Sequence, residues 1–597
     1  MTANSVPTRS TINGGRPAWR RRSSVPLLLG LLLSATGLRA EELASEPAQK
    51  KSAERWREPI GLCLSSDERF LVLALRKAGE IVTLDLQTKT IVDRLRTSGR
   101  LECIAKSKED VFVAVDSEKD KAIVVRVADG KLTQIRRIGT GPQPTFCTVD
   151  SNGRYIYVSN RVGKTVESFD LAGGTLRFQA DVPFEPHCLL LAKDERHLIV
   201  ADAYKAQFVV LEAGSGSWIS TRAYPGTNVR GLAFSPDGKS LSFTHQILTE
   251  KSMITRDAIF WGALFTNNLR SVSFADVLKP QQDGNDWTEL EYLGDSRRGA
   301  GDPGAIAMAE DGTTFLCLSG VDELGIQRQG SMSLERLRVG TRPVAVALSR
   351  DGRRAHVACA GSDDVAIVEL LSQPTVTKIP LAPPAELTSA ERGELLFSDA
   401  RLSLDGWFSC QSCHTDGHTN GSNADTDGDG NYGAPKNTPS LLGVADTPPW
   451  GWTGRFDTLE EQIKTSMVST LHGNYPSKEQ IADLATYLRT LRPRQTRSMS
   501  VFVERGKKVF LSRGCANCHE GDLSTNQGLF DVGLDDELGG HRQFNPPSLR
   551  GVGRTAPYLH DGRAERLEVI FRQVGHPEPN RIPEEEIAPL VDYLKSL

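Results

Sequence analysis

The chain has 597 residues, of which 39% are hydrophobic and 24% charged, and its formal net charge is −4. This balance is typical of a globular protein and excludes a disordered or fibrous chain. A length of 597 residues predicts several domains, since an ordinary domain has about 150 residues. A net charge so close to zero provides no broad basic surface, so nucleic-acid binding is not expected.

The first 40 residues carry the pattern of a secretory signal. Three arginines at 20–22 precede an apolar stretch at 25–38, and Ala40 then stands before two glutamates. That stretch is shorter than the roughly 20 apolar residues that cross a membrane, and no later segment supplies them. We therefore expect a signal peptide over residues 1–40 and a periplasmic or otherwise exported protein without a stable membrane span. An uncleaved membrane anchor is the alternative.

A short pattern recurs through residues 55–380. Each copy has an apolar strand, an Asp or Gly turn and a second strand such as Tyr155-Ile156-Tyr157-Val158. The first strands carry a small residue at positions 63, 103, 147, 188, 231, 305 and 345. A spacing near 40 residues is typical of propeller blades, and we predict an N-terminal all-β seven-bladed propeller over residues 55–380. The pattern resembles the YVTN-type bacterial β-propellers, which carry no catalytic signature.

The long interval between positions 231 and 305 predicts an insertion between about His245 and Thr288, with Phe260 and Trp261 inside it. Four copies of the repeat place a cysteine at the small-residue position, namely Cys63, Cys103, Cys147 and Cys188. Buried cysteine behaves as a small hydrophobe, so packing is favoured over disulfides or a metal site. The lone histidines His187 and His245 are expected to be structural.

The composition changes after Pro383-Pro384, where two pentapeptides stand out. Cys410-Gln411-Ser412-Cys413-His414 and Cys515-Ala516-Asn517-Cys518-His519 share the Cys-x-x-Cys-His pattern of covalent c-type haem attachment. A zinc site or a thioredoxin-like dithiol does not require histidine directly after the second cysteine, twice in one chain. We therefore predict two covalent c-type haems, attached through the four cysteines and bound at iron by His414 and His519.

The sequence around the two sites is also repeated. The paired segments are Glu391-Arg392-Gly393 with Glu504-Arg505-Gly506, Phe397 with Phe510, and residues 477–491 with residues 583–597. The last pair has apolar residues at three- and four-residue steps, which predicts a helix with one buried face. Each half is therefore expected to run from a helix through a haem site and a loop to a closing helix. We predict two all-α class I cytochrome c domains, residues 386–493 and 498–597.

Between each site and its closing helix, residues 437–444 match residues 545–552, and residues 450–455 match residues 558–563. Together with the paired sites, these segments resemble the bacterial di-haem cytochrome c peroxidase superfamily. The resemblance covers about 210 residues. It implies an oxidoreductase with two haems, and the superfamily also includes the di-haem oxidase that matures a tryptophan-derived quinone.

The resemblance also implies roles for individual residues. Trp452 falls on the aromatic that relays electrons between the haems, and Gln462 on the glutamine of the peroxide pocket. His560, which matches Trp452 in the second half, would lie at the haem interface. His472 stands where the family has its pocket glutamate, which departs from the usual acid/base chemistry.

The second axial ligands follow from the same resemblance. The methionine that commonly binds the second iron corresponds to Val574. His576, two residues later, could replace it, or this haem could be five-coordinate. Met467 is the methionine within the haem segment, so at most one haem can have a His/Met ligand pair; a core role for Met467 is the alternative. Ligand identity shifts the reduction potential substantially.

The loop Asp425-Thr426-Asp427-Gly428-Asp429-Gly430 is rich in the carboxylates that calcium prefers. Lys436 stands where an EF-hand has its bidentate glutamate, so a solvated loop is favoured over a calcium site. His418, four residues after His414, is expected on the loop surface.

Taken together, these patterns predict an exported di-haem enzyme that reduces hydrogen peroxide to water. The electrons would come from a small redox protein, a cytochrome or a cupredoxin, and the family pattern makes the first haem peroxidatic. Two alternatives stay open: an oxidase acting on a protein or small organic substrate that the propeller positions, and an electron-transfer protein with both irons capped. The enzyme needs an open coordination position at one iron, because peroxide must reach that iron, whereas an electron carrier with both irons capped has none.

Overall fold

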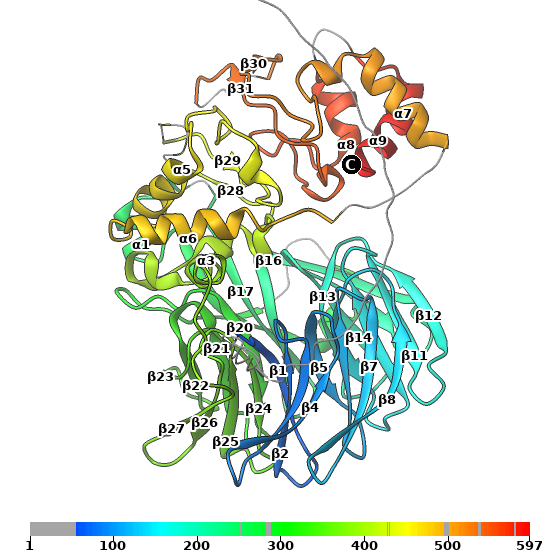
Figure 1. Ribbon diagram of the computed structural model, residues 1–597, viewed down its shortest axis with the longest axis vertical. Coiled ribbons are helices and arrows are strands. Elements are labelled where there is room, and N and C mark those ends of the chain that lie inside the picture. The colour runs from blue at the N-terminus through cyan, green and yellow to red at the C-terminus, as the bar shows by residue number, and fades with distance from the viewer. Residues whose placement is uncertain are drawn as a thin grey trace, which may run out of the picture. The chain divides into compact units, whose positions relative to one another are not determined.

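The computed structural model describes residues 55–597 except residues 251, 282–287, 427, 429, 431, 495–500, 535–538 and 578–580 (Figure 1). The predicted signal peptide lies outside the described residues. Residues 53–597 form one compact unit. Within it we call residues 59–380 the β region, residues 388–493 the first half and residues 501–597 the second half. Among the described residues, no helix has the length and apolar character needed to cross a membrane.

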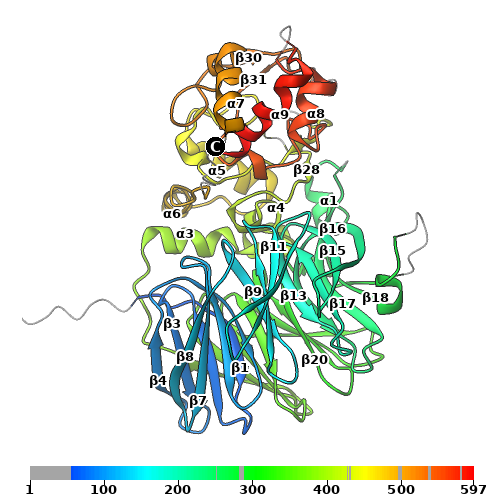
Figure 2. The same cartoon turned by 90° about the vertical axis from the view of Figure 1, so that its right-hand side faces the viewer.

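The β region is built from antiparallel sheets (Figure 2). Five described sheets have four strands each, and one has seven. The first four-stranded sheet holds β1 (Pro59–Leu64), β2 (Phe70–Leu75), β3 (Glu80–Asp85) and β4 (Thr90–Arg96), and the second holds β5 (Leu101–Lys106), β6 (Val111–Asp116), β7 (Lys121–Ala128) and β8 (Lys131–Gly139). The third holds β9 (Pro144–Val149), β10 (Tyr155–Asn160), β11 (Thr165–Asp170) and β12 (Leu176–Asp181). The fourth holds β20 (Pro303–Met308), β21 (Thr314–Leu318), β22 (Glu323–Gln327) and β23 (Leu334–Arg338), and the fifth holds β24 (Pro343–Leu348), β25 (Arg354–Cys359), β26 (Asp364–Glu369) and β27 (Thr375–Pro380). The seven-stranded sheet holds β13 (Pro186–Leu191), β14 (His197–Asp202), β15 (Lys205–Glu212), β16 (Trp218–Phe234), β17 (Ser240–Leu248), β18 (Phe265–Ser273) and β19 (Thr288–Tyr292).

Burial follows strand position within each sheet. Every residue of β2 is buried, whereas β4 alternates between exposed and half-buried positions. This pattern is expected where one strand is covered on both faces and an outer strand is covered on one. The first strands of neighbouring sheets pack on one another, and β1 also packs against β24.

The prediction of seven separate blades is wrong. Strand β16 runs unbroken for 17 residues and pairs with β15 in its first part and with β17 in its last part. Because no loop interrupts β16, two sequence repeats share a single seven-stranded sheet. The predicted insertion contributes the short helices α1 (Arg256–Phe260) and α2 (Phe274–Val277), and also strand β18 of that sheet.

The prediction of two all-α domains is wrong as well. The described helices of this part are α3 (Ser389–Phe397), α4 (Cys410–Cys413), α5 (Leu459–Thr465), α6 (Lys478–Leu488), α7 (Val501–Ser512), α8 (Leu567–Val569) and α9 (Glu584–Lys595), with π-helical turns at Ser466–Thr470 and Ile570–Val574. Long irregular segments separate them, together with the two-stranded pairs β28 (Asn423–Ala424) with β29 (Lys436–Asn437) and β30 (Phe530–Asp531) with β31 (Gln543–Phe544). These connecting segments are rich in Gly and Pro, which interrupt helices.

The first and last helices of each half pack together in the same way. Helix α3 packs on α6, and α7 packs on α9. A Cβ at Gly393 would lie 2.1 Å from the Asp483 carbonyl oxygen, and one at Gly506 would lie 1.9 Å from the Pro589 carbonyl oxygen. The repeated Glu-Arg-Gly segments therefore place glycine where two helix backbones meet.

Candidate functional site

The first Cys-x-x-Cys-His motif forms a single helical turn. Cys410 and Cys413 lie at the two ends of α4, and His414 leaves the helix directly after it. Burial raises the pKa of both thiols to about 12. The His414 Nδ1 atom lies 3.0 Å from the Pro439 carbonyl oxygen, so Nδ1–H donates there and the Nε2 lone pair is left to bind a metal.

The electrostatics of His414 also suit a metal ligand. Burial lowers the pKa of His414 to about 4, so its imidazole is neutral at neutral pH. A neutral ring is the form that coordinates iron. The donor set of two thiols and one oriented neutral imidazole therefore fits a covalently held haem.

A cavity of about 370 Å³ adjoins this turn, and residues of both halves line it. The predicted site residues that meet there are Cys410, Cys413, His414, Trp452, Gln462 and Met467. Tyr558 and Leu559 join them from the second half, and Ile254 joins them from the β region. Most of the other lining residues are apolar, as a porphyrin requires.

Trp452 lies where the two halves meet. Its Nε1–H donates to the Asn437 carbonyl oxygen at 2.8 Å, and its own carbonyl oxygen accepts from the backbone N–H of Asn545 at 2.8 Å. In return, the backbone N–H of Asn437 donates to the His560 carbonyl oxygen at 2.8 Å. The two repeated segments thus bind each other reciprocally, with Trp452 and His560 in equivalent places.

The other predicted residues of the first site lie differently. The Gln462 side chain, on α5, donates to the Ser466 hydroxyl at 3.1 Å, and Met467 is 2% exposed. His472 is not among the residues that line the cavity, and its Nε2 atom lies 2.9 Å from the Ile254 carbonyl oxygen, on the β region. Its backbone φ of 47° turns the chain at this point. The first cavity therefore gathers Gln462 and Met467, and His472 faces the β region.

The second motif is built more openly. Cys515 begins a short 3-10 turn, and the His519 Nδ1 atom lies 3.3 Å from the Ser524 carbonyl oxygen. Burial lowers the pKa of His519. Burial, and to a smaller extent the charge of His519, lowers the pKa of His576 to about 4. The Nδ1 atom of His576 is buried and makes no hydrogen bond within the described residues, while Val574 packs in the second hydrophobic core. His519 and His576 are thus close enough in the second half for the charge of one to affect the pKa of the other.

Two loop residues bear on earlier expectations. His418 is buried, whereas the sequence predicted it on the loop surface: its Nδ1 atom lies 2.7 Å from the Ser440 hydroxyl and its Nε2 atom 2.9 Å from the Arg554 carbonyl oxygen. Asp425 accepts from the backbone N–H of Gly433 at 2.9 Å. Asp427 and Asp429 lie outside the described residues, so the preference for a solvated loop over a calcium site stays a prediction. The cysteines of the β region are free thiols.

The sequence did not indicate the residues that hold the first motif from the β region. The Ser412 hydroxyl, between the two cysteines, donates to the Asp302 carboxylate at 2.6 Å, and the Ser409 hydroxyl donates to the other oxygen of Asp302 at 2.5 Å. The Asn228 side chain donates to the Ser412 carbonyl oxygen at 2.7 Å. Asp302 and Asn228 are more than 100 residues away in the chain, and no local pattern marks such a contact.

Known proteins resemble the C-terminal part of the chain. A family model described as di-haem cytochrome c peroxidase matches residues 388–510. The C-terminal region is similar to the di-haem cytochrome c peroxidases. The methylamine utilization protein MauG of Methylorubrum extorquens is 27% identical over 280 residues, which cover 37% of this chain and 78% of the relative. The cytochrome c551 peroxidase of Nitrosomonas europaea is 27% identical over 273 residues, covering 36% of this chain and 81% of the relative.

Solved structures also show similarity. Hydrazine synthase of Kuenenia stuttgartiensis aligns with a TM-score of 0.48 at 17% identity, over 54% of this chain and 99% of that chain. A streptogramin B lyase aligns with a TM-score of 0.40 at 16% identity, over 51% of this chain and 91% of that chain. The sequence relatives support the prediction of a di-haem, peroxidase-like oxidoreductase, and they imply haem as its cofactor.

Proposed function

We propose that the chain is an exported enzyme with two covalent c-type haems that reduces hydrogen peroxide to water. The reaction consumes one peroxide, two electrons and two protons and releases two waters. The electrons come from a small donor protein, a cytochrome or a cupredoxin. The observation that supports this proposal is the meeting of Cys410, Cys413, His414, Trp452 and Gln462 around one largely apolar cavity.

Each residue of the first site has its own role in this proposal. Haem, when bound, supplies an iron that takes up and gives up single electrons. Cys410 and Cys413 would hold it covalently, and His414 would bind its iron, with the Pro439 carbonyl fixing the ring orientation. The Gln462 side-chain amide lines the same cavity and would orient a small polar substrate there.

The second site would receive electrons and pass them to the first. Cys515, Cys518, His519 and His576 would hold its haem. Trp452 lies in the contact between the halves and has an oxidisable indole, so it would carry electrons across that contact. His472, which faces Ile254, would fix the wall of the first cavity rather than move a proton.

Steady-state kinetics test the proposed reaction directly. The purified protein should oxidise a reduced small cytochrome or cupredoxin only when peroxide is present, with two donors oxidised per peroxide. Gln462→Ala should lower kcat/KM for peroxide at least about tenfold, the effect of about 1.4 kcal/mol. Gln543→Ala, an exposed change of the same kind on β31, should leave it unchanged. A protein with two haems that consumes no peroxide contradicts the proposal.

The second candidate function is that of an electron-transfer protein with both irons capped, and the position of Met467 supports it. Met467 is 2% exposed and lines the cavity beside His414. If it binds iron, Met467→Leu should open a coordination position and let cyanide bind at the first haem. If peroxide turnover occurs in the native protein and cyanide binds without this change, the carrier function is excluded.

A further inference from the structure

A second cavity lies between the β region and the first half and has no part in the proposed peroxide reaction. Its volume is about 990 Å³. The first strands of the β-region repeats form its walls, and Glu394 of α3, Gln411, Asp416 and Tyr487 cover it from the first half. A space of this size accommodates an organic ligand.

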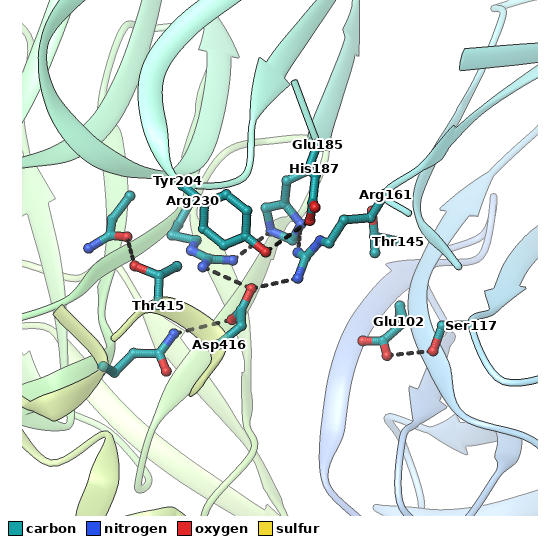
Figure 3. A network of polar contacts seen from close by, with 12 residues as sticks. Glu102, Ser117, Thr145, Arg161, Glu185, His187, Tyr204, Arg230, Thr415 and Asp416 are labelled. Carbon is teal, nitrogen blue, oxygen red and sulfur yellow. Dashed lines mark hydrogen bonds and ion pairs between the residues drawn. The ribbon is translucent and has the colours of Figure 1, made fainter. Parts of the chain in front are cut away.

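Four side chains form a charged cluster on the wall of this cavity (Figure 3). Arg161 donates from Nη1 to the Asp416 carboxylate at 2.7 Å, and Arg230 pairs with the same oxygen at 3.1 Å. The two arginines also reach opposite nitrogens of one imidazole: Arg161 Nη2 lies 2.9 Å from His187 Nδ1, and Arg230 Nη1 lies 3.1 Å from His187 Nε2.

Hydrogen-bond donors exceed acceptors in this cluster. A neutral imidazole has one acceptor nitrogen, and the other carries a hydrogen. Only one of the two arginines can therefore donate to His187, and the other guanidinium N–H faces a ring N–H. The two guanidiniums carry two positive charges against the single negative charge of Asp416. Arg161 is 8% exposed, and its Nε atom has no hydrogen-bond partner within the described residues.

The other charged groups around the cavity are mostly paired. Arg76 pairs with Glu58 and Glu102, and Lys77 pairs with Glu394. The remaining pairs of lining cations are Arg100 with Glu102, Arg342 with Glu58, and Arg492 with Asp446. Arg76, Lys77, Arg100 and Arg342 thus share the three carboxylates of Glu58, Glu102 and Glu394, whereas Arg161 and Arg230 share the single carboxylate of Asp416. A ligand in the cavity can reach these groups, because the Asp416 and Arg230 side chains are 32% and 19% exposed.

We propose that this cavity binds an amphiphilic organic anion, with its anionic group between Arg161 and Arg230. A carboxylate or sulfonate would supply the acceptors that the cluster lacks and would offset its positive charge. Below the cluster, the first strands line the cavity with apolar side chains, among them Ile104, Phe146, Leu189 and Ile306. The apolar body of the ligand packs there. This site is separate from the peroxide site and independent of the proposed reaction.

Calorimetric titration of the full-length haem protein with benzoate tests this proposal, with benzamide as the neutral ligand of the same shape. Benzoate should bind one to one, and benzamide at least tenfold more weakly. Arg161→Gln and Arg230→Gln should each weaken benzoate binding at least tenfold. Arg572→Gln, which removes an arginine paired with Glu584 on the exposed surface, should leave it unchanged. Asp416→Asn should tighten benzoate binding, because it removes the competing carboxylate.

The outcomes are decisive in either direction. The absence of saturable benzoate binding, equal binding of benzamide, or full affinity in the Arg161→Gln and Arg230→Gln proteins overturns the proposal. If these two variants lose their haems or unfold at a lower temperature, the test rests on the folded Asp416→Asn protein. An unchanged or weaker affinity of that protein for benzoate overturns the proposal. If that variant also fails to fold, the preference of the native protein for benzoate over benzamide decides.

Discussion

The two halves share a helix pair but differ in what surrounds their Cys-x-x-Cys-His motifs. Phe397 and Tyr487 of the first half have ring centroids 5.3 Å apart, as do Phe510 and Tyr593 of the second. Ser412, between the cysteines of the first motif, is fully buried and bound by Asp302 and Asn228 of the β region. Its counterpart in the second motif, Asn517, is exposed, and its carbonyl accepts from Asn526 of the same half.

This difference shows where the β region acts on the haem-binding part. Residues outside the ligand set orient the ligands and tune a metal site. In the first half these outer residues include Asp302, Asn228 and Ile254, which belong to the β region. We infer that the β region positions the first haem specifically, while the second half holds its haem with its own residues.

The largest expected effect is the loss of one haem at a time. Replacing Cys410 and Cys413 with Ala should reduce the pyridine haemochrome value from two haems per chain to one, because a covalent haem needs its thiols. Replacing Cys515 and Cys518 should do the same at the other site. A value that stays at two in either variant would refute the assignment of that motif.

Asp302→Ala should destabilise the first half alone. The carboxylate accepts from Ser409 and Ser412, and hydrogen bonds to a charged group contribute about 1.5–3 kcal/mol each, so we expect a loss of about 3 kcal/mol. The matched change in the second half, Glu586→Ala, breaks a partly exposed pair with Arg513 and should cost less than about 1 kcal/mol. Urea unfolding followed by haem absorbance measures both, and equal costs would contradict the inference.

Local patterns in the sequence predicted the elements that depend on neighbouring residues. The Cys-x-x-Cys-His spacing and the Glu-Arg-Gly repeats are of this kind, since Gly393 and Gly506 both lie where helices cross. Contacts between distant segments were not predictable. His472 was expected near peroxide, yet it lies against Ile254, 218 residues away. The prediction of separate blades was wrong for a related reason, because the sequence repeats do not show that one continuous strand, β16, pairs with both β15 and β17.

The pH dependence of stability should include a contribution from His418, for which the second half has no titratable counterpart. Burial lowers the pKa of His418, so the folded protein resists its protonation while the unfolded chain takes up a proton near pH 6.5. Stability should therefore fall as pH drops below 6.5, by at most about 1.4 kcal/mol per pH unit for this one group. His418→Gln should reduce that slope in urea unfolding. The position four residues after His519 is Leu523, which cannot titrate. A slope that is unchanged in the variant would show that His418 is not responsible.

Trp452→Phe should slow electron passage between the halves. Phenylalanine preserves much of the packing but is harder to oxidise, and it loses the hydrogen bond to Asn437. After rapid mixing with peroxide, oxidation of the second haem should slow by at least about tenfold, which corresponds to about 1.4 kcal/mol on the barrier. Trp450→Phe is the matched control, because the Trp450 Nε1–H donates at 3.0 Å to Val444 and its backbone pairs with Phe456, whereas the Trp452 carbonyl accepts from Asn545 of the second half. If both variants retain the native rate, Trp452 is a packing residue.

The smallest effect should come from the reciprocal contact between the halves. The Asn437 side chain donates to the Pro557 carbonyl oxygen at 2.6 Å, and the Asn545 side chain donates to the Pro449 carbonyl oxygen at 2.5 Å. Replacing either with Ala should cost about 1 kcal/mol of unfolding free energy, whereas Asn526→Ala, whose side chain bonds within the second half, should leave the contact intact. Because the two bonds are equivalent, similar costs are expected from Asn437→Ala and Asn545→Ala. If only one variant slows electron passage, the halves are symmetric in structure but not in the route of the electrons.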